Sequence, residues 1–342
     1  MRLLKLAAIC LVAGPVWAQD ADEGRDPGDD GPVPAVSDGG SLSFTFENDI
    51  FGGTDESYTN GVRLTYVTPR NELPWIGRFA RRNLNWLTDA DDWYGTFAAG
   101  QNIYTPVEIT FRPPDAQDRP YAGFSYVSVG ISADRGDRLD TWALDVGVVG
   151  ELAQADDIQR VVHDTGGFDD PVGWDFQLKN EPGVRLLYER KYRFGYETDL
   201  PLFDLEMDVL PSYSFALGNV DTSASAGLTA RIGDRLGDNY GPPRVLPALA
   251  SPGFFEEVDG VGWYLFAGVD GRFIGRNIFL EGNSFRDSPS VEPHRFVADI
   301  QGGLALQFDN VEVAYTHVFR SPEFQGQQGF AQFGSLTISR KF

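Results

Sequence analysis

The sequence predicts an all-β protein, a single antiparallel β-barrel of about twelve strands that spans a bacterial outer membrane. Segments of nine or more residues alternate between apolar and polar side chains. The chain ends on a phenylalanine that follows alternating apolar residues. Beyond the N-terminal segment, no apolar run reaches the length of about 18 residues that a membrane-spanning helix needs.

Residues 1–18 have the features of a secretory signal peptide. Arg2 and Lys5 form its positive start, residues 6–16 its apolar stretch, and Ala18 ends a cleavage site of the small-residue type. The alternative is a short transmembrane anchor. The apolar run is too short to cross a bilayer, so a cleaved signal is favoured.

The mature chain is predicted to be acidic and free of thiols. Its only cysteine, Cys10, lies within the signal, which excludes a disulfide, a cysteine metal site and a cysteine nucleophile. The formal net charge of −22 becomes about −24 once the two basic signal residues are removed. This charge argues against nucleic acid as a partner. An acidic surface suits divalent cations, although solubility alone also explains it.

Two further regions follow the signal. Residues 19–40 are rich in Asp, Gly and Pro and are expected to form a flexible acidic linker, because they cannot bury a core. Residues 41–342 are expected to form the barrel. A chain of this length often divides into two soluble domains, but large β-barrels fold as one.

Alternation with a period of two residues runs through this region. In residues 204–217, one face carries Leu205 and Met207, and the other carries Glu206 and Asp208. A soluble sandwich also alternates, but its strands are usually shorter and do not so often place charges on one face. Lipid outside and a polar interior explain the pattern better.

Twelve segments show this pattern, and an even number allows the sheet to close without free edges. The expected strands are 41–47, 61–68, 94–102, 121–133, 140–150, 183–194, 204–217, 223–232, 261–274, 295–308, 311–320 and 330–342.

The last strand ends on Phe342 after Leu336 and Ile338. This ending resembles the C-terminal signature by which bacterial barrels are recognised for assembly. Arg340 departs from the signature, but its aliphatic stem can snorkel at the membrane interface.

With both termini in the periplasm, the loops after odd-numbered strands face the exterior. The short turn Asp309-Asn310 then lies on the periplasmic side, as short turns should. Two long segments, 69–93 and 233–260, also fall there, which the topology does not explain. The expected external loops are 48–60, 103–120, 151–182, 218–222, 275–294 and 321–329.

A first polar cluster in these loops begins with Glu47, Asn48 and Asp49 and continues to residues 58–61. Asn48 and Asp49 end a strand at the outer rim, where an amide oxygen and a carboxylate could ligate Ca²⁺. An ordinary turn is the alternative, because Asn, Asp, Thr and Gly favour turns. Taken alone, this cluster favours the turn.

A second cluster runs from Asp115 to Gly123. Arg119 could pair with a phosphate or a carboxylate through two parallel hydrogen bonds. The alternative is an ion pair with a neighbouring acid at the barrel rim. In so acidic a chain, the ion pair is favoured.

A third cluster lies in the loop 151–182. Residues 156–163 are predicted to form a short helix that places Gln159 and His163 on one face. Ile158 and Val162 form an adjacent apolar face that could pack on the barrel rim or touch an acyl chain.

His163 is the histidine best suited to act as a general base near neutral pH. A single histidine is more often structural than catalytic. Of the other two, His317 lies in the lipid-facing register and His294 has no evident partner. The chain has no G-x-S-x-G nucleophile motif. A water deprotonated by His163, with Ca²⁺ polarising an ester carbonyl, remains available.

The motifs, taken in order, resemble those of the outer-membrane lipid A 3′-O-deacylases over residues 41–194, with the C-terminal half matching more loosely as barrel strands. The motifs that carry the resemblance are Glu47-Asn48-Asp49, Tyr58-Thr59-Asn60-Gly61, Gly100-Gln101-Asn102-Ile103-Tyr104-Thr105-Pro106, Asp118-Arg119-Pro120-Tyr121-Ala122-Gly123, Gln159 with His163, and Gly173-Trp174 with Gln177-Leu178 and Asn180-Glu181-Pro182.

The resemblance implies a twelve-stranded barrel with an outward-facing, Ca²⁺-dependent site that removes the 3′-acyloxyacyl group of lipid A, the membrane anchor of lipopolysaccharide. It implies that His163 activates a water, as in secreted phospholipase A2. Asn48 and Asp49 match the essential pair on the first strand, and Gln159 matches the glutamine one helical turn before the histidine.

The remaining site residues are also implied by the resemblance. An acidic residue is expected after the histidine, and Asp169 is the nearest candidate, with Glu181 as the alternative; with Asp49 they are the candidate metal ligands. Arg119 is the candidate for the lipid phosphates, and Tyr121 and Thr59 are candidates for further substrate contacts.

Two other functions stay open at this point. An outer-membrane phospholipase of different specificity would use a Ser/His pair, and no serine is placed beside His163. A passive pore would also suit the interior charges, which fit a water-filled channel or a plugged polar core equally well.

Overall fold

The computed structural model describes the barrel and most of its loops. The predicted signal peptide and all of the predicted linker except Gly39 and Gly40 lie outside the described residues. The described residues are 39–49, 60–166, 170–200, 203–234, 236, 239–241 and 258–342.

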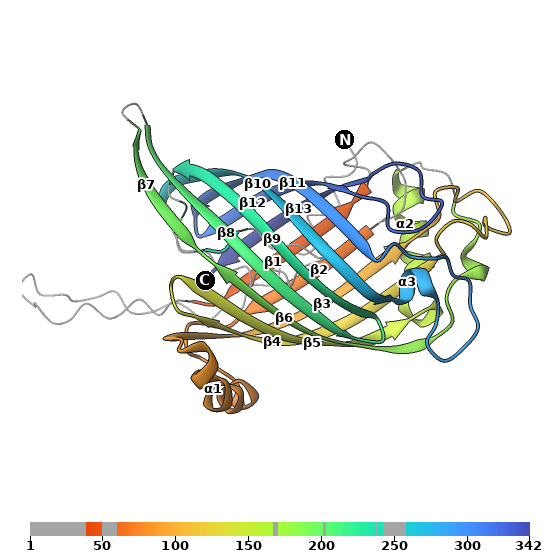
Figure 1. Ribbon diagram of the computed structural model, residues 1–342, viewed down its shortest axis with the longest axis horizontal. Coiled ribbons are helices and arrows are strands. Elements are labelled where there is room, and N and C mark those ends of the chain that lie inside the picture. Colours follow the sequence, from red (N-terminus) through yellow and green to blue (C-terminus); the bar gives the residue numbers. More distant parts are fainter. Residues whose placement is uncertain are drawn as a thin grey trace, which may run out of the picture.

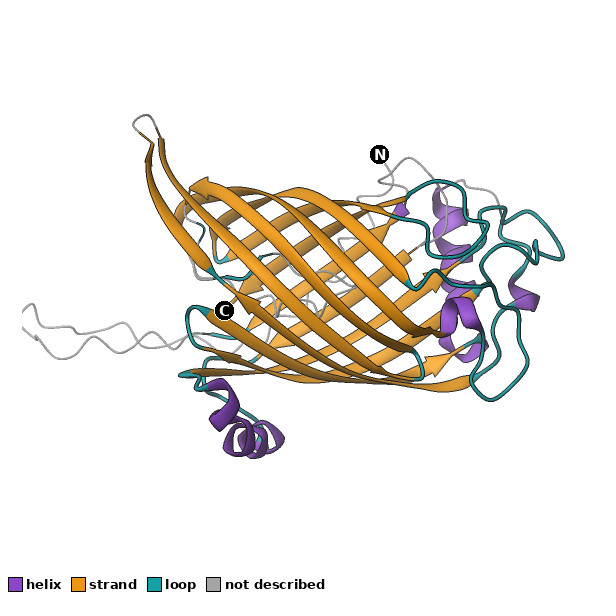
Figure 2. Ribbon diagram, viewed as in Figure 1, coloured by secondary structure: helices purple, strands orange, loops and turns teal. Residues whose placement is uncertain are grey.

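The strands form one closed antiparallel sheet, in which β1 pairs with both β2 and β13. Figures 1 and 2 show the strands inclined around a single barrel. The strands are β1 (Ser41–Asn48), β2 (Asn60–Val67), β3 (Asp92–Tyr104), β4 (Ala122–Asp134), β5 (Arg138–Val149), β6 (Glu181–Tyr192), β7 (Phe194–Leu200), β8 (Phe203–Gly218), β9 (Asp221–Asp234), β10 (Val258–Asn277), β11 (Phe296–Asp309), β12 (Val311–Arg320) and β13 (Ala331–Lys341).

Strands β6 and β7 are two parts of one barrel strand. Both pair with β8, β6 through Lys191 opposite Ser212 and β7 through Phe194 opposite Val209. The barrel therefore has twelve strands, as predicted. The prediction ended this strand at residue 194, whereas β7 continues to Leu200 and projects with β8 beyond the rim (Figure 1).

Alternate side chains point to lipid and to the interior, as the sequence pattern predicts. Outward residues such as Phe44, Leu64 and Val127 are exposed, whereas Ser43 and Arg63, next to them on the same strands, are buried. The outer surface of the barrel is thus apolar and its interior polar.

Charges inside the barrel are paired between neighbouring strands. Arg185 binds Asp145 at 2.7 Å and Arg320 binds Asp299 at 2.9 Å, and all four side chains are at most 6% exposed. Arg231 pairs in the same way with Asp208. Pairing is required because an isolated charge removed from water is strongly unfavourable.

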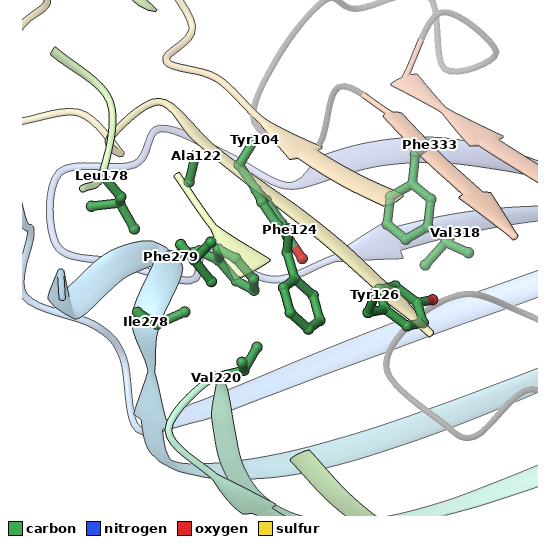
Figure 3. Packing of buried hydrophobic residues seen from close by; sticks show 11 residues of the cluster. Tyr104, Ala122, Phe124, Tyr126, Leu178, Val220, Ile278, Phe279, Val318 and Phe333 are labelled. Atoms are coloured by element: carbon green, nitrogen blue, oxygen red, sulfur yellow. The ribbon is translucent and has the colours of Figure 1, made fainter. Parts of the chain in front are cut away.

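At the end opposite the C-terminus, apolar side chains fill the interior (Figure 3). The short helix α3 (Ile278–Glu281) inserts Ile278 and Phe279 between the strands. Phe279 stacks on Tyr104 with ring centroids 4.2 Å apart, and Phe124 stacks on Tyr126. This part of the lumen is packed as a core, which disfavours an open channel through it.

Two longer helices lie at opposite ends of the barrel (Figure 1). Helix α1 (Trp75–Thr88) is at the end that holds the C-terminus, and α2 (Ala155–Gly166) is at the other end with α3. The predicted helix over 156–163 is confirmed within α2. Among the described residues, no helix combines the length and apolar character needed to cross a membrane.

Candidate active site

Helix α2 is attached to the outside of the barrel by polar side chains of the wall. Gln101 of β3 and Ser125 of β4 both donate to the carbonyl oxygen of Ala153, at 2.6 and 2.8 Å. Ala153 ends the short helical turn η3 (Glu151–Ala153), which leads into α2. The start of the helix is therefore fixed against the outward faces of β3 and β4.

Gly123 allows this close approach. A Cβ built on Gly123 would lie 2.4 Å from the Cβ of Ala155, far inside van der Waals contact. Ala155 itself is fully buried. A glycine on the strand and an alanine on the helix thus set the distance between α2 and the wall.

One face of α2 is turned toward the protein. Gln159 and His163, one and two turns after Ala155, are only 2% and 4% exposed. Their side chains meet, with Nε2 of Gln159 3.3 Å from Nε2 of His163. The sequence predicted that the two residues share a helix face, and the structure brings their side chains together.

Trp174 orients the Gln159 side chain. It lies in the short helical turn η4 (Trp174–Phe176), and its Nε1–H donates to Oε1 of Gln159 at 2.8 Å. With Oε1 accepting this bond, the amide NH₂ of Gln159 points at His163. In the tautomer of His163 whose Nε2 is unprotonated, this nitrogen accepts from the amide, and that tautomer is the one that a general base needs.

A row of neighbouring positions leads from β1 to this helix. Asn48 is opposite Asn60, Asn60 opposite Ile103, and Ile103 opposite Gly123. With strands about 4.8 Å apart, Asn48 is about 10 Å from Ile103 along the row. Ile103 packs in one cluster with Ala155 and Trp174.

The residues of this row are buried, although they belong to the outward-facing register of their strands. Asn48, Asn60 and Ile103 are at most 5% exposed, whereas Phe44 and Leu64, four residues further along the same faces, are 38% and 47% exposed. Outward-facing polar side chains are thus enclosed at this rim, beside the face of α2 that carries His163.

Oxygen atoms suited to a hard cation gather in the same row. Asp49 follows Asn48 and is fully buried, and Oδ1 of Asn60 is buried without a hydrogen-bond partner among the described residues. Carboxylate and amide oxygens are ligands that Ca²⁺ prefers. No group of three or more His, Asp or Glu side chains in the described part of the chain is arranged to hold a metal.

Glu181, another candidate ligand, is occupied by hydrogen bonds from the loops. Its carboxylate accepts from Asn219 Nδ2 at 3.0 Å, from Asn283 Nδ2 at 3.1 Å and from the backbone N–H of Ser284 at 2.8 Å. These bonds join the start of β6 to two loops at the rim. Asp169, the remaining candidate ligand, and Thr59, a candidate for substrate contact, lie outside the described residues.

Arg119 points into the barrel. Its side chain is 0% exposed, it forms an ion pair with Glu323 at 3.4 Å, and its guanidinium lies 5.0 Å from the ring centre of Tyr104. This is the ion pair with a neighbouring acid that the sequence favoured over a phosphate contact.

Glu323 is the centre of this charge cluster. Arg320 at 3.6 Å and Arg272 at 3.9 Å approach the same carboxylate as Arg119. Burial alone would raise the pKa of Glu323, but the three arginines outweigh burial and lower the pKa below its ordinary value.

Tyr121 packs beneath the helix. It is 1% exposed, its ring lies 4.9 Å from that of Trp174, and its hydroxyl donates to the carbonyl oxygen of Ile109 at 3.1 Å. Its observed contacts are with the protein, in the layer that supports Trp174.

Comparison with known proteins identifies the family. The family model described as outer membrane protein LpxR matches residues 4–342. The chain belongs to the LpxR family. The resemblance to outer-membrane lipid A 3′-O-deacylases is therefore confirmed, and membership supports an outer-membrane enzyme that deacylates lipid A.

One solved structure of this family has the same fold. LpxR from Salmonella typhimurium superposes with a TM-score of 0.71 at 19% sequence identity, covering 88% of this chain and 100% of that one. The β domain of the Bordetella autotransporter BrkA gives a TM-score of 0.46 at 10% identity, covering 89% and 99%. No curated protein matches the sequence.

Within this LpxR-family chain, sequence reasoning missed two residues of the site. Trp174 was recognised only as part of a motif, and Gly123 only as the end of another. Both act through contacts between segments distant in sequence. No periodic pattern in the sequence could have indicated that the side chain of Trp174 donates to that of Gln159.

Proposed function

We propose that the protein is a Ca²⁺-dependent lipid A 3′-O-deacylase whose site opens to the outer leaflet of the outer membrane. The observation that carries this proposal is the Gln159–His163 pair, buried between α2 and the outward face of the barrel wall. A site outside the wall is reached by a lipid from within the membrane.

In the proposed reaction, His163 is the general base. Its Nε2 takes a proton from a water, whose oxygen attacks the carbonyl carbon of the 3′ ester. The tetrahedral intermediate then expels the sugar oxygen, which receives the proton from His163. The contact of 3.3 Å between Gln159 and His163 is long, so a water can replace it at Nε2.

Gln159 and Trp174 are proposed as positioning residues. The bond from Trp174 fixes the amide of Gln159, and before the water enters, the amide in turn orients the ring of His163. Holding a base in one orientation is a large part of its catalytic value.

Asp49 would hold the calcium ion, with Asn48 and Asn60 offering amide oxygens beside it. When bound, the ion would polarise the ester carbonyl and stabilise the charge that develops on its oxygen. In the chain itself, the covered row of outward positions excludes bulk water from this region.

The exposed side of α2 suits acyl chains. Ile158 and Val161 are 40% and 57% exposed, and Leu152, just before the helix, is 66% exposed. The side chain of Val162, which the sequence assigned to this face, lies outside the described part. Exposed apolar residues around a buried polar pair fit a substrate with several acyl chains.

The other two functions are less well supported. The apolar cluster around Phe279 and the paired charges occupy parts of the described lumen, which disfavours a pore. An outer-membrane phospholipase would use the same exposed surface, so the substrate itself must separate that activity from lipid A deacylation.

The test is mass spectrometry of lipid A from cells that express the wild-type protein, His163→Ala or His294→Ala. His294 is exposed in a loop at the same end and serves as the matched control. We expect loss of the 3′-acyloxyacyl group with the wild type and the control only. An unchanged lipid A pattern with the wild type, beside released fatty acid from phospholipid, would establish the phospholipase.

Calcium dependence is measured on the purified protein. Chelation should abolish deacylation and added Ca²⁺ should restore it, whereas Asp49→Asn should need a higher Ca²⁺ concentration. Full activity in chelator would reject the metal.

A further inference from the structure

Helix α1 differs from its surroundings in charge. Residues 75–88 contain Arg78, Arg81 and Arg82 and no acidic residue, in a chain whose net charge is −22. All three arginines are exposed. A basic helix on so acidic a protein suits a partner of opposite charge.

The helix lies against the outside of the barrel. Its Ala80 and Leu84, with Leu73 just before it, pack on a cluster that includes Trp93 of β3 and Ile131 of β4. These strand residues belong to the outward-facing register, as Phe97 and Val129 do. The helix therefore covers the lipid side of the wall.

Hydrogen bonds to the strands hold α1 in this place. Arg138 of β5 donates to the carbonyl oxygen of Thr88 at the end of the helix, and at its start Arg78 Nη1 donates to the carbonyl oxygen of Leu73, at 2.7 Å, within the same segment. The backbone N–H of Asn71 donates to Trp93 at 2.8 Å. Both ends are thus tied to the barrel.

The outer face of α1 is an aromatic stripe formed by Trp75, Phe79 and Trp86. These side chains are 73%, 66% and 82% exposed. Spacings of four and seven residues place them on one side of the helix. Three large aromatic side chains so exposed on one helix face indicate a surface that is covered in the working protein.

The position of α1 along the barrel identifies the covering. Two strand residues from Ile131, the outward-facing row of Phe97, Val129 and Leu144 is exposed, and no helix among the described residues covers it. Two strand residues span about 7 Å. The helix therefore lies immediately beside the apolar band of the wall, at the level where acyl chains give way to headgroups.

We propose that α1 is an interfacial anchor that binds the phospholipid leaflet at this end of the barrel. The aromatic stripe enters the boundary between acyl chains and headgroups, and the arginines bind anionic phosphates. Helices of this type bury their apolar face about 5–10 Å into the interface. With this end in the periplasm, as in the proposed orientation, the leaflet is the inner one.

The absence of cysteine from the predicted mature chain permits a direct test. Phe79→Cys places a spin label on the aromatic stripe, and Asn85→Cys places one on the polar face of the same helix as the matched control. The full mature protein is reconstituted in phosphatidylethanolamine bilayers with or without phosphatidylglycerol. Collision with oxygen and with a water-soluble nickel chelate then reports the depth of each label.

We expect the label at position 79 to be several-fold less accessible to the nickel chelate than the label at 85. Phosphatidylglycerol should deepen it further, and replacing Arg78, Arg81 and Arg82 by Gln should remove that increment. Equal chelate accessibility at both positions overturns the anchor. No effect of phosphatidylglycerol overturns recognition of anionic lipid.

A second copy of the chain is the other possible occupant of the stripe. Dipolar coupling between labels at position 79 at high lipid-to-protein ratio would show such a dimer and overturn the proposal. Because the bilayer is symmetric and no substrate is present, the result depends neither on orientation nor on deacylase activity, so its failure is distinct from failure of the proposed function.

Discussion

Helices α1 and α2 both pack on the outer wall of the barrel, at opposite ends. Helix α1 turns apolar side chains to the wall, whereas α2 turns polar ones to it. Helix α1 turns Ala80 and Leu84 to the wall and leaves aromatic side chains exposed. Helix α2 buries Gln159 and His163 and leaves Ile158 exposed. Both helices are amphipathic, but the wall-facing side of α1 attaches the helix, whereas that of α2 carries the polar residues of the site.

The contacts beneath each helix explain the difference. Under α1 the wall presents Trp93 and Ile131, which need an apolar partner. Under α2 the wall offers Gln101 and Ser125 as hydrogen-bond donors and Gly123 as a gap. The residues of the strand, as much as those of the helix, decide which face is buried.

The largest expected effect comes from the buried face of α2. His163→Asn should lower kcat for lipid A deacylation by about 10²–10⁴-fold, because loss of a general base has that size. Trp86→Ala, on the exposed face of α1, should leave the rate in detergent within a factor of about two, as expected for an exposed site. Equal losses in both variants would contradict the contrast between the helices.

The second-largest effect is expected from a change in the distance between α2 and the wall. Gly123→Ala should lower kcat by about tenfold to a hundredfold, because the added Cβ displaces Ala155 and with it His163. Gly271→Ala is the matched control, since a Cβ there meets nothing within 4 Å. Heat-modifiable migration on gels should show that both barrels are folded. A rate unchanged by Gly123→Ala would mean that the helix spacing is not critical.

A smaller effect is expected from the bond that orients Gln159. Trp174→Phe keeps an aromatic side chain, although a smaller one, and removes the Nε1–H donor; loss of this bond is worth about 1 kcal/mol, or roughly fivefold in kcat. The pH–rate profile should also shift, because the amide no longer holds Nε2 of His163 as the acceptor. A stability change with an unaltered profile would indicate only a packing role.

The smallest expected effect on activity comes from a substitution at Glu323, inside the barrel. The lowered pKa of Glu323 stabilises the fold above the ordinary glutamate pKa, and this contribution is lost as pH falls through the folded-state value. In urea titrations, Glu323→Gln should be less stable at pH 7 and should lose less stability below pH 4.5. Activity per folded molecule should change little, and a collapse of activity would link this cluster to α2.

Much of the fold could be predicted because alternation is a local property. A strand that faces lipid on one side and a packed polar interior on the other must alternate between apolar and polar residues. Residues 204–217 and 296–308 can therefore be recognised as strands without knowledge of the strands they pair with. The added length of β7 could not be predicted, because it depends on pairing with β8 outside the membrane pattern.

The candidate site was predicted in part. The pairing of Gln159 with His163 follows from helical spacing, but their burial depends on which face meets the wall. The orientation of Arg119 into the lumen depends on Glu323, which is distant in sequence. The sequence placed the segment 69–93 at the periplasmic end, but it did not show that the helix there would pack on the lipid side of β3 and β4.

The sequence by itself determined the barrel, its strand number and the helix that carries His163, since each follows from the spacing of residues along the chain. Tertiary structure decided that Trp174 orients Gln159, that Gly123 sets the depth of α2, and that Arg119 is an interior ion pair. The physical reason is the separation of the interacting residues along the chain. Periodic burial depends on neighbouring residues, whereas hydrogen bonds and close packing between distant segments form only once the sheet has closed.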